Sequence, residues 1–330
     1  MFDNQQIAAE QDRDFLFRAA ARMEEALGPL ILEAVNDPKV NEVMLNDDGE
    51  LYIERQPGGM QAAGRIDKVS AFTIVKTLAT LVHQNLNSRH PLLGGEIPFN
   101  GSRIEIQIPP VVKAPSFTIR KHNALRLPLE EVIKSGMLTK EQGAFLREAL
   151  CARRSIVVSG GTGTGKTTLV NSLLSELARL CPQDRVVTVE DTAELKVTAV
   201  NRLNLVTTDG IGMDALLRSA LRSRPDRIVV GEIRGPEALD LIDAFSTGHQ
   251  GGLTTVHAGS VEQALKRLTL LVSRNAQAPR FIEPAIAQAL DILVQVERRP
   301  YRHVSAIAKV RGYEDGRFLI EYISKEESVK

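Results

Sequence analysis

Residues 160–167 limit the folds open to this chain more than any other segment. They read Gly-Gly-Thr-Gly-Thr-Gly-Lys-Thr and fit the pattern G-x-x-x-x-G-K-[ST] in full. The β-branched run from Ile156 to Val158 precedes them, and a helix-compatible stretch follows. In this context glycines let the backbone wrap around a phosphate, with loop N–H groups and the helix start facing the anion. The segment therefore predicts a nucleotide-phosphate site, a P-loop.

The P-loop pattern also assigns roles to its last residues. Lys166 is expected to reach the β and γ phosphates, and the Thr167 hydroxyl to bind Mg²⁺. ATP and Mg²⁺ are the cofactors that these residues predict. The predicted nucleotide-binding residues are Gly161, Thr162, Gly163, Thr164, Gly165, Lys166, Thr167 and Thr168.

A P-loop enzyme also needs a group that polarises the attacking water. Glu232 follows the apolar run Ile228 to Gly231 and is predicted to take this role beside the γ-phosphate. Most P-loop enzymes place a Mg²⁺-organising aspartate directly before such a residue, but Gly231 stands here. Glu190 and Asp191, at the end of the preceding β-like run, are then expected to support the metal through waters. The alternative is that this acidic pair only caps a helix.

Two histidines follow in the segment from Thr247 to His257. His257 ends a buried-strand pattern at the edge where ligands bind in doubly wound sheets, so it is predicted to sense the γ-phosphate or Glu232. For His249 the sequence favours neither a structural nor a functional role. Neither histidine has neighbours at metal-ligand spacing.

The order of patterns along the chain predicts two domains. Residues 1–126 show short strand-like runs and helical stretches, which indicate a smaller α+β domain. Residues 127–150 are expected to be a linker with connecting helices, including the capping box from Thr139 to Gln142. From 151 to 330 strands and helices alternate, which predicts an α/β domain with a mainly parallel sheet and helices on both faces.

Several elements can be placed in the expected domains. An amphipathic helix is expected from Phe15 to Leu32, interrupted at Gly28-Pro29, and a hairpin turn from Asn46 to Gly49. In the larger domain, the expected strands and helices are Ser155 to Ser159, a helix from Lys166, Val186 to Glu190, Asp214 to Ser223, Arg227 to Gly231, a helix from Pro236, Leu253 to Val256, and a helix capped by Ser260. Asp291 to Ile323 is expected to add strands around a turn at Glu314 to Gly316.

Composition excludes some classes of function. The 41 basic and 41 acidic residues cancel, and the chain has 4% aromatic residues and no Trp, which argues against a nucleic-acid-coating or base-stacking protein. We expect neither a secretory signal nor a transmembrane anchor, because no apolar run approaches about 20 residues. Cys151 and Cys181 are expected to be reduced, small core residues.

Several further motifs accompany the P-loop. They are Asn41 to Asn46, Gly101 to Arg103, Ala114 to Lys121, Val189 to Glu194, Gly231 to Ala238 and the histidine segment. Together with the P-loop, these motifs resemble secretion ATPases nearly end to end, and specifically the TrbB-type ATPases of conjugative transfer, which belong to the type IV secretion traffic ATPases.

The resemblance implies a hexameric ring, with nucleotide held between an N-terminal domain and a RecA-like C-terminal domain. It implies partners in the inner-membrane secretion channel and its coupling proteins, and a peripheral place on the cytoplasmic face of that membrane. Glu190, Glu232 and His257 match the acidic, water-polarising and histidine positions of the family. Arg103 and Arg120 match arginines that reach the γ-phosphate, the alternative being surface salt bridges. The role of Arg234 stays open between a subunit contact and a phosphate contact.

Other functions remain as alternatives. Type II secretion and pilus-extension ATPases commonly carry a four-cysteine zinc module, but only Cys181 follows the P-loop here. Pilus-retraction and tight-adherence ATPases lack that module, and the stretch from Pro109 to Arg120 favours the conjugative type over them. A ring-shaped DNA motor would need a basic groove, for which Arg298, Arg299 and Arg302 are candidates, although a solvated charged face is the preferred interpretation. No stable sequence-specific binding of nucleic acid is expected.

Overall fold

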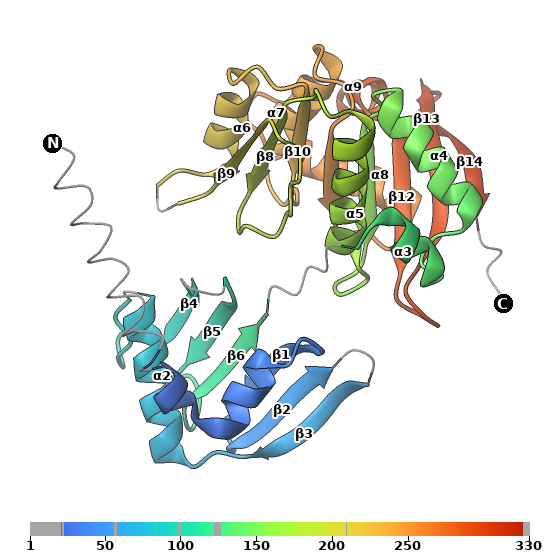
Figure 1. Cartoon of the computed structure of the whole chain (residues 1–330). Helices are drawn as coiled ribbons and strands as arrows, with labels where there is room; N and C mark the ends of the chain where they lie inside the picture. The colour runs from blue at the N-terminus through green and yellow to red at the C-terminus, as the bar shows by residue number, and fades with distance from the viewer. Residues whose placement is uncertain are drawn as a thin grey trace, which may run out of the picture. The chain divides into compact units, whose positions relative to one another are not determined.

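The computed structural model of the protein describes residues 21, 23–55, 58–82, 84–97, 101–121, 127–208 and 210–325. The chain forms two compact units, Met1–Asn123 and Ala124–Lys330, and each contains its own β-sheet (Figure 1). Among the described helices, none has the length and apolar character that a membrane span requires.

The first unit is built on a six-stranded sheet in the order β3-β2-β1-β6-β5-β4. All its neighbouring strands pair antiparallel. Alternate residues of the central strands are buried, because one face of the sheet is covered and the other is not. The elements are β1 (Val40–Leu45), β2 (Glu50–Arg55), β3 (Gly59–Arg65), α2 (Lys68–Leu81), β4 (Leu92–Glu96), β5 (Arg103–Gln107) and β6 (Ser116–Arg120).

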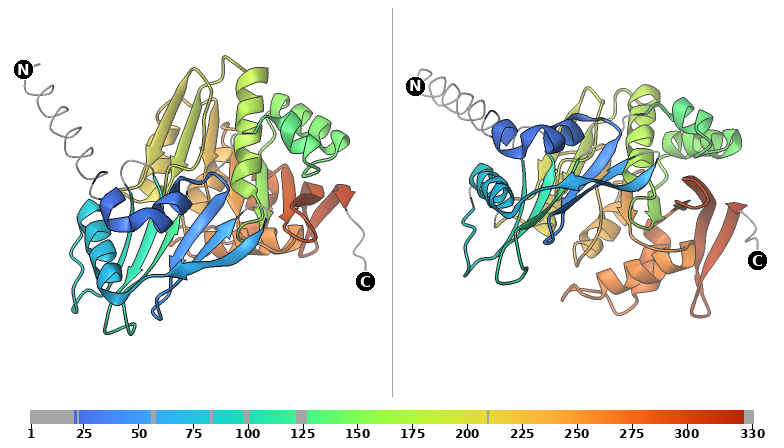
Figure 2. Two further views of the ribbon diagram at one scale, coloured as in Figure 1. Left: turned by 60° about the horizontal axis from the view of Figure 1, so that its bottom comes forward. Right: turned by 90° about the horizontal axis from the view of Figure 1, so that it is seen from below.

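Two helical segments cover the buried face of this sheet, the helical residues 23–36 and α2 (Figure 2). Gly28 has a φ of 68° directly before Pro29, but residues 23–36 are helical throughout, so the expected interruption appears only as a local irregularity. The part of that expected helix before residue 21 lies outside the described residues. The hairpin between β1 and β2 is confirmed, and Gly49 takes a φ of 86° in its turn.

The second unit is built on an eight-stranded sheet in the order β14-β13-β12-β7-β11-β10-β8-β9. The strands from β12 to β9 pair parallel, and β13 and β14 add an antiparallel hairpin beside β12. Its elements are α3 (Leu129–Lys134), α4 (Lys140–Cys151), β7 (Ile156–Gly160), α5 (Lys166–Leu180), β8 (Val186–Glu190), β9 (Arg202–Val206), α6 (Met213–Leu221), β10 (Arg227–Val230), α7 (Ala238–Ser246), β11 (Leu253–Val256), α8 (Val261–Val272), α9 (Ile282–Ala289), β12 (Ile292–Glu297), β13 (His303–Glu314) and β14 (Arg317–Lys325).

A separate core lies on each face of this sheet. In β7, Ile156 and Val158 belong to the core that includes α3, α4 and α5, while Val157 belongs to the core that includes α6 to α9. Strands that are buried on both faces read as continuous apolar runs, which is why β7, β8, β10 and β11 were recognisable in the sequence. Part of the segment 127–150, expected to connect the two domains, packs into this unit, because Leu129 and Val132 are buried in the core that includes α3, α4 and α5.

Some expected elements are confirmed, and others were missed. The predicted capping box is present, with the Thr139 hydroxyl and the Gln142 side chain each bonded to the other residue's backbone N–H. Strands β3, β4 and β9 and helix α9 were not predicted. In β3 the residues are mostly small or polar, so the strand has no apolar alternation to recognise.

The prediction that both cysteines are small core residues is wrong for Cys151. Both are free thiols, with Cys151 exposed and Cys181 half-buried. The buried residues of α4 include Leu146, Ala149 and Leu150, and Cys151 comes one residue later. One residue turns a helix by about 100°, which carries Cys151 off the buried face.

Candidate nucleotide site

The P-loop joins β7 to α5 in a conformation that depends on its glycines. Gly163 and Gly165 have φ values of 70° and 101°, a region that side-chain-bearing residues rarely adopt. A Cβ on Gly160 would lie 2.5 Å from the carbonyl oxygen of Val296 on β12. The Thr164 hydroxyl closes the loop by donating to the carbonyl of Gly161 at 3.0 Å. The loop can therefore approach β12 closely while it turns into the helix.

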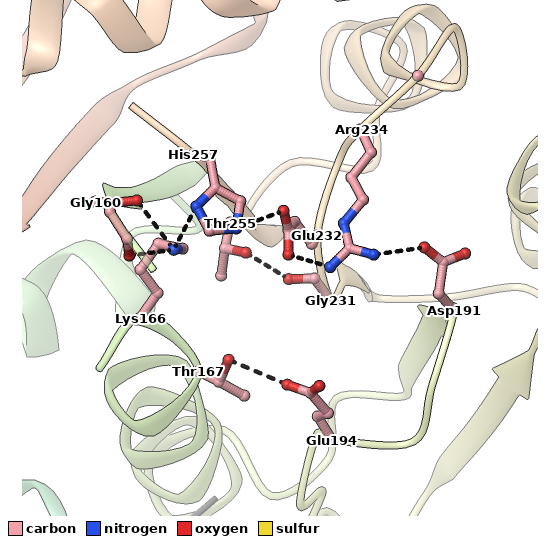
Figure 3. A network of polar contacts seen from close by, with 12 residues as sticks. Gly160, Lys166, Thr167, Asp191, Glu194, Gly231, Glu232, Arg234, Thr255 and His257 are labelled. Atoms are coloured by element: carbon pink, nitrogen blue, oxygen red, sulfur yellow. Dashed lines mark hydrogen bonds and ion pairs between the residues drawn. The ribbon is translucent and has the colours of Figure 1, made fainter. Parts of the chain in front are cut away.

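Lys166 lies at the start of α5, and its side chain is buried. Its Nζ donates to the carbonyl oxygens of Gly160 and Gly161, at 3.0 and 2.9 Å. It also lies 3.2 Å from Nδ1 of His257 (Figure 3). An ammonium group has no acceptor, so Nδ1 must accept this bond and the proton of a neutral ring sits on Nε2. The lysine is thus held inside the loop by groups that a phosphate oxygen could replace.

Glu232 is connected to Lys166 through His257. Its Oε1 lies 3.0 Å from Nε2 of His257, and Figure 3 shows the histidine between the lysine and the carboxylate. Burial lowers the pKa of His257, and the positive charge of Lys166 lowers it further. The ring is therefore neutral near pH 7 and able to accept from Lys166. Its Nε2 lies close to Oε1 of Glu232, a buried oxygen that has no hydrogen-bond partner among the described residues.

Arg234 joins Glu232 to the acidic segment after β8. It donates from Nη2 to Oε2 of Glu232 at 2.8 Å, and its Nη1 lies 3.5 Å from Oδ2 of Asp191. Burial acts to raise the pKa of Glu232, but the hydrogen bond and charge of Arg234, with His257 and Lys166, hold that pKa below its ordinary 4.5. Glu232 is therefore a carboxylate near neutral pH, as a water-polarising group must be.

The acidic residues after β8 are placed differently from one another. Glu190 is buried, and its Oε1 accepts from the N–H groups of Glu194 and Leu195 at 2.9 and 2.8 Å. Burial raises the pKa of Glu190 to about 7, against the lowering effect of these two donors. The Thr167 hydroxyl lies 3.4 Å from Oε2 of Glu194. The Thr167 hydroxyl thus faces the carboxylate of Glu194.

Gly231 stands where most P-loop enzymes have an aspartate, and the packing around it explains the glycine. A Cβ at this position would lie 3.2 Å from Cγ of Glu190 and 3.4 Å from its Oε1. A carboxylate side chain there would meet that of Glu190 at close range in a buried setting. The glycine therefore makes room for the side chain of Glu190.

The remaining candidate residues belong to other parts of the chain. His249 follows α7, and its Nδ1 is buried without a hydrogen-bond partner among the described residues. Arg103 and Arg120 belong to the first unit, where they are opposite each other on β5 and β6. Glu42 on β1 lies 3.6 Å from Arg120, whose side chain is half exposed.

Sequence reasoning recovered the centre of the network but missed part of its surroundings. It predicted Lys166, Glu232 and His257, which the structure brings together, and it left the role of Arg234 open. It gave no role to Glu194, although the spacing of four residues from Glu190 within one acidic segment was visible.

Neutralising Arg234 should move the acid limb of any Glu232-dependent activity. In Arg234→Gln the largest cause that lowers the Glu232 pKa is lost while burial still raises it. The carboxylate is then protonated over a wider acidic range, so the acid limb of the pH–rate profile should shift to higher pH. Arg218→Gln, which removes an exposed arginine of α6 bonded to Asp214, is the control. An unshifted acid limb in Arg234→Gln would show that the ion pair does not set this pKa.

Comparisons with known proteins agree on one family. The family model described as type II/IV secretion system protein matches residues 25–311. A probable conjugal transfer protein TrbB of Sinorhizobium fredii is 41% identical over 305 residues, which cover 92% of this chain and 93% of that protein. The conjugal transfer protein TrbB of Rhizobium radiobacter is 38% identical over 311 residues, covering 94% and 96%.

A solved structure supports the same assignment at the level of the fold. The X-ray structure of the Legionella pneumophila ATPase DotB has a TM-score of 0.58 and 17% identity, over 86% of this chain and 80% of that one. The chain belongs to the type II/IV secretion system protein family, with TrbB conjugal transfer proteins among its relatives.

Proposed function

We propose that this chain is a Mg²⁺-dependent ATPase that works as a hexameric ring motor in conjugative or type IV secretion. The observation that carries the proposal is the contact of Lys166 and Glu232 with the two ring nitrogens of one histidine. Pure nucleotide binding needs a phosphate cradle and a lysine, whereas a carboxylate kept ionised beside them serves to polarise water. The family relationship adds the secretion context.

The roles of the residues follow from their positions. The P-loop N–H groups and Lys166 hold the β and γ phosphates, and Glu232 orients the attacking water. Neutral His257 contacts both Lys166, which binds the γ-phosphate, and Glu232. When the γ-phosphate draws Lys166 away from Nδ1, the histidine can move and so change the position of Glu232. We assign the second unit to the RecA-like type, supported by its parallel strands and the P-loop at the end of β7.

The donors near Thr167 suit a magnesium ion. Mg²⁺ keeps several waters and takes one or two protein oxygens together with phosphate oxygens. Thr167 offers a hydroxyl 3.4 Å from the Glu194 carboxylate, and Asp191 is on the same segment. In this proposal Thr167 binds the ion, Glu194 and Asp191 support it through water, and Glu190 holds the acidic segment in place through its two backbone contacts. Bound Mg²⁺ would neutralise charge that develops on the phosphates.

We propose that six copies assemble, and that the ring lies at the cytoplasmic face of the inner membrane with channel and coupling proteins as partners. The TrbB relatives support this setting by name as conjugal transfer proteins. A pilus-retraction or tight-adherence role is the second candidate, and no observed contact favours it. Stable sequence-specific binding of nucleic acid is not part of the proposal.

The decisive assay is ATP hydrolysis by the full chain with and without Mg²⁺. We expect turnover with Mg²⁺ and its loss when EDTA removes the ion. Absence of turnover by the assembled protein under both conditions would overturn the ATPase assignment.

Replacing Glu194 should change the magnesium requirement specifically. In Glu194→Gln, the Mg²⁺ concentration for half-maximal turnover should rise by about tenfold, the order of effect seen when supporting partners of metal sites are removed. ADP affinity measured in EDTA should not change. Glu148→Gln, at an exposed glutamate of α4, is the matched control. A normal magnesium requirement in Glu194→Gln would exclude this glutamate from the metal site.

Assembly is tested by mass. With ATP and Mg²⁺ we expect light scattering to give six times the 36.2 kDa of one chain. Nucleotide bridging between subunits would favour the ring by mass action. A protein that hydrolyses ATP at full rate while remaining monomeric at micromolar concentration would contradict the ring as the working state.

A further inference from the structure

The segment between β12 and β13 has a place in the fold that its sequence did not predict. Residues 298–302 read Arg-Arg-Pro-Tyr-Arg and were interpreted as a solvated charged face. However, β12 pairs in parallel with β7, and Val296 lies opposite Gly160, where the P-loop begins. The chain that leaves β12 therefore starts beside the P-loop.

Two arginines of this segment approach the P-loop. Arg302 is half-buried, and its Nε donates to the carbonyl oxygen of Gly163 at 3.0 Å. A Cβ on Gly163 would lie 3.6 Å from Nη1 of Arg298. A Cβ on Gly165 would lie 3.2 Å from Cε of Met137 and 3.8 Å from Cδ of Arg302. Two guanidinium groups and a thioether thus line one side of the loop.

The opposite side of the loop carries the hydrolytic residues. In the sheet, β11 and β10 lie on one side of β7 and β12 lies on the other. Glu232 follows β10 and His257 follows β11, so the γ-phosphate end of a bound nucleotide belongs on that side. Because loop N–H groups and the helix start hold the phosphates in a P-loop, the nucleoside end of a nucleotide with its γ-phosphate near Glu232 would leave the loop away from Glu232. The segment after β12 lies on the side of β7 opposite β11 and β10.

We infer that Arg298, Arg302 and Met137 form the subsite for the nucleoside end of a bound purine nucleotide. The inference rests on the proposed nucleotide-binding function. Arg298 contacts the α-phosphate, and Arg302, anchored on Gly163, presents its planar guanidinium to the face of the base. Arg side chains stack on aromatic planes, and a thioether packs against ring edges.

This subsite separates two kinds of ligand. ADP carries the nucleoside, whereas inorganic pyrophosphate carries only the phosphates that the P-loop holds. A side chain that contacts the nucleoside end therefore matters for ADP and not for pyrophosphate. A side chain that only shapes the P-loop matters for both.

The test is equilibrium binding of ADP and of pyrophosphate, each with Mg²⁺, to the full chain by titration calorimetry. Arg302→Gln keeps a polar side chain beside Gly163 but removes the guanidinium plane, and Arg298→Ala changes an exposed side chain. We expect each variant to bind ADP about tenfold more weakly, equivalent to about 1.4 kcal/mol, with pyrophosphate affinity unchanged. Arg299→Ala, in the same segment, should bind both ligands as the wild type does.

The results separate a failure of the nucleoside subsite from a failure of the proposed nucleotide-binding function. Equal losses for ADP and pyrophosphate, or no loss for either, would overturn the nucleoside subsite while the P-loop function stands. A wild-type chain that binds neither ligand would overturn the proposed function itself, and the subsite with it. Arg298→Ala decides the matter if Arg302→Gln fails to fold.

Discussion

Glu232→Gln should bind ATP with near-normal affinity and hydrolyse it about a thousandfold more slowly, within the range for loss of a general base. The amide keeps the size of the carboxylate but cannot draw a proton from water. Loss of its charge also removes the ion pair with Arg234 and the contact with His257, neither of which holds nucleotide phosphates. The expected defect therefore lies in the chemical step and not in binding.

Lys166→Ala should fail in a different way. The lysine donates to the P-loop carbonyls of Gly160 and Gly161, and its loss removes the charge expected to face the β and γ phosphates. Nucleotide binding and turnover should be lost together. Lys140→Ala, at an exposed lysine of α4, should behave as the wild type.

Two measurements separate these outcomes. Equilibrium binding of a fluorescent ATP analogue reports the ground state, and single-turnover hydrolysis reports the chemical step. Glu232→Gln with normal single-turnover rates would remove Glu232 from the mechanism. Lys166→Ala with normal ATP affinity would mean that the loop backbone alone holds the phosphates.

The sequence predicted those parts of the site that local signals specify. The glycine pattern of the P-loop requires positive φ values, and Gly163 and Gly165 have them. Glu232 follows a strand whose continuous apolar run marks it as buried on both faces. The carboxyl ends of parallel strands meet at one edge of a sheet, which is why Glu232 and His257 could be expected near the P-loop.

The parts that depend on distant pairing were not predictable in the same way. Arg302 contacts Gly163 across 139 residues of sequence, through the pairing of β12 with β7. Nothing in the composition of residues 298–302 distinguishes a segment beside the P-loop from a solvated basic face. The roles within the acidic segment also depended on packing. Glu190 and Glu194 have the same chemistry, and only burial and the backbone contacts of Glu190 separate them.

Arg103 and Arg120 form a pair of neighbouring cations in the first unit. They are direct cross-strand neighbours on β5 and β6. Their positions alternate with Ile104 and Ile119, which are buried, so both arginines point to the uncovered face of the sheet. Like charges opposite each other destabilise a sheet, and an acidic residue stands next to each arginine. Glu42 lies 3.6 Å from Arg120, and Glu96 on β4 is the cross-strand neighbour of Arg103.

We propose that the anion which these arginines serve is the γ-phosphate, as the match to the arginines of secretion ATPases implies. A transition state with charge spread over three oxygens gains from added guanidinium groups, and arginine fingers contribute about a thousandfold or more in rate. Arg120→Ala and Arg103→Ala should therefore lose turnover by about this factor. ADP affinity should be retained, because ADP lacks the γ-phosphate.

A stability measurement makes this prediction sharper. If the two arginines serve an anion rather than the stability of the sheet, then removing one should not lower the melting temperature of the nucleotide-free protein. Arg65→Ala, which removes an exposed arginine of β3 paired with Glu50 on the same sheet, is the control and should keep normal turnover. Variants of Arg103 and Arg120 that unfold more easily but hydrolyse ATP at the normal rate would show that the pair is structural, and its assignment to the γ-phosphate would have to be withdrawn.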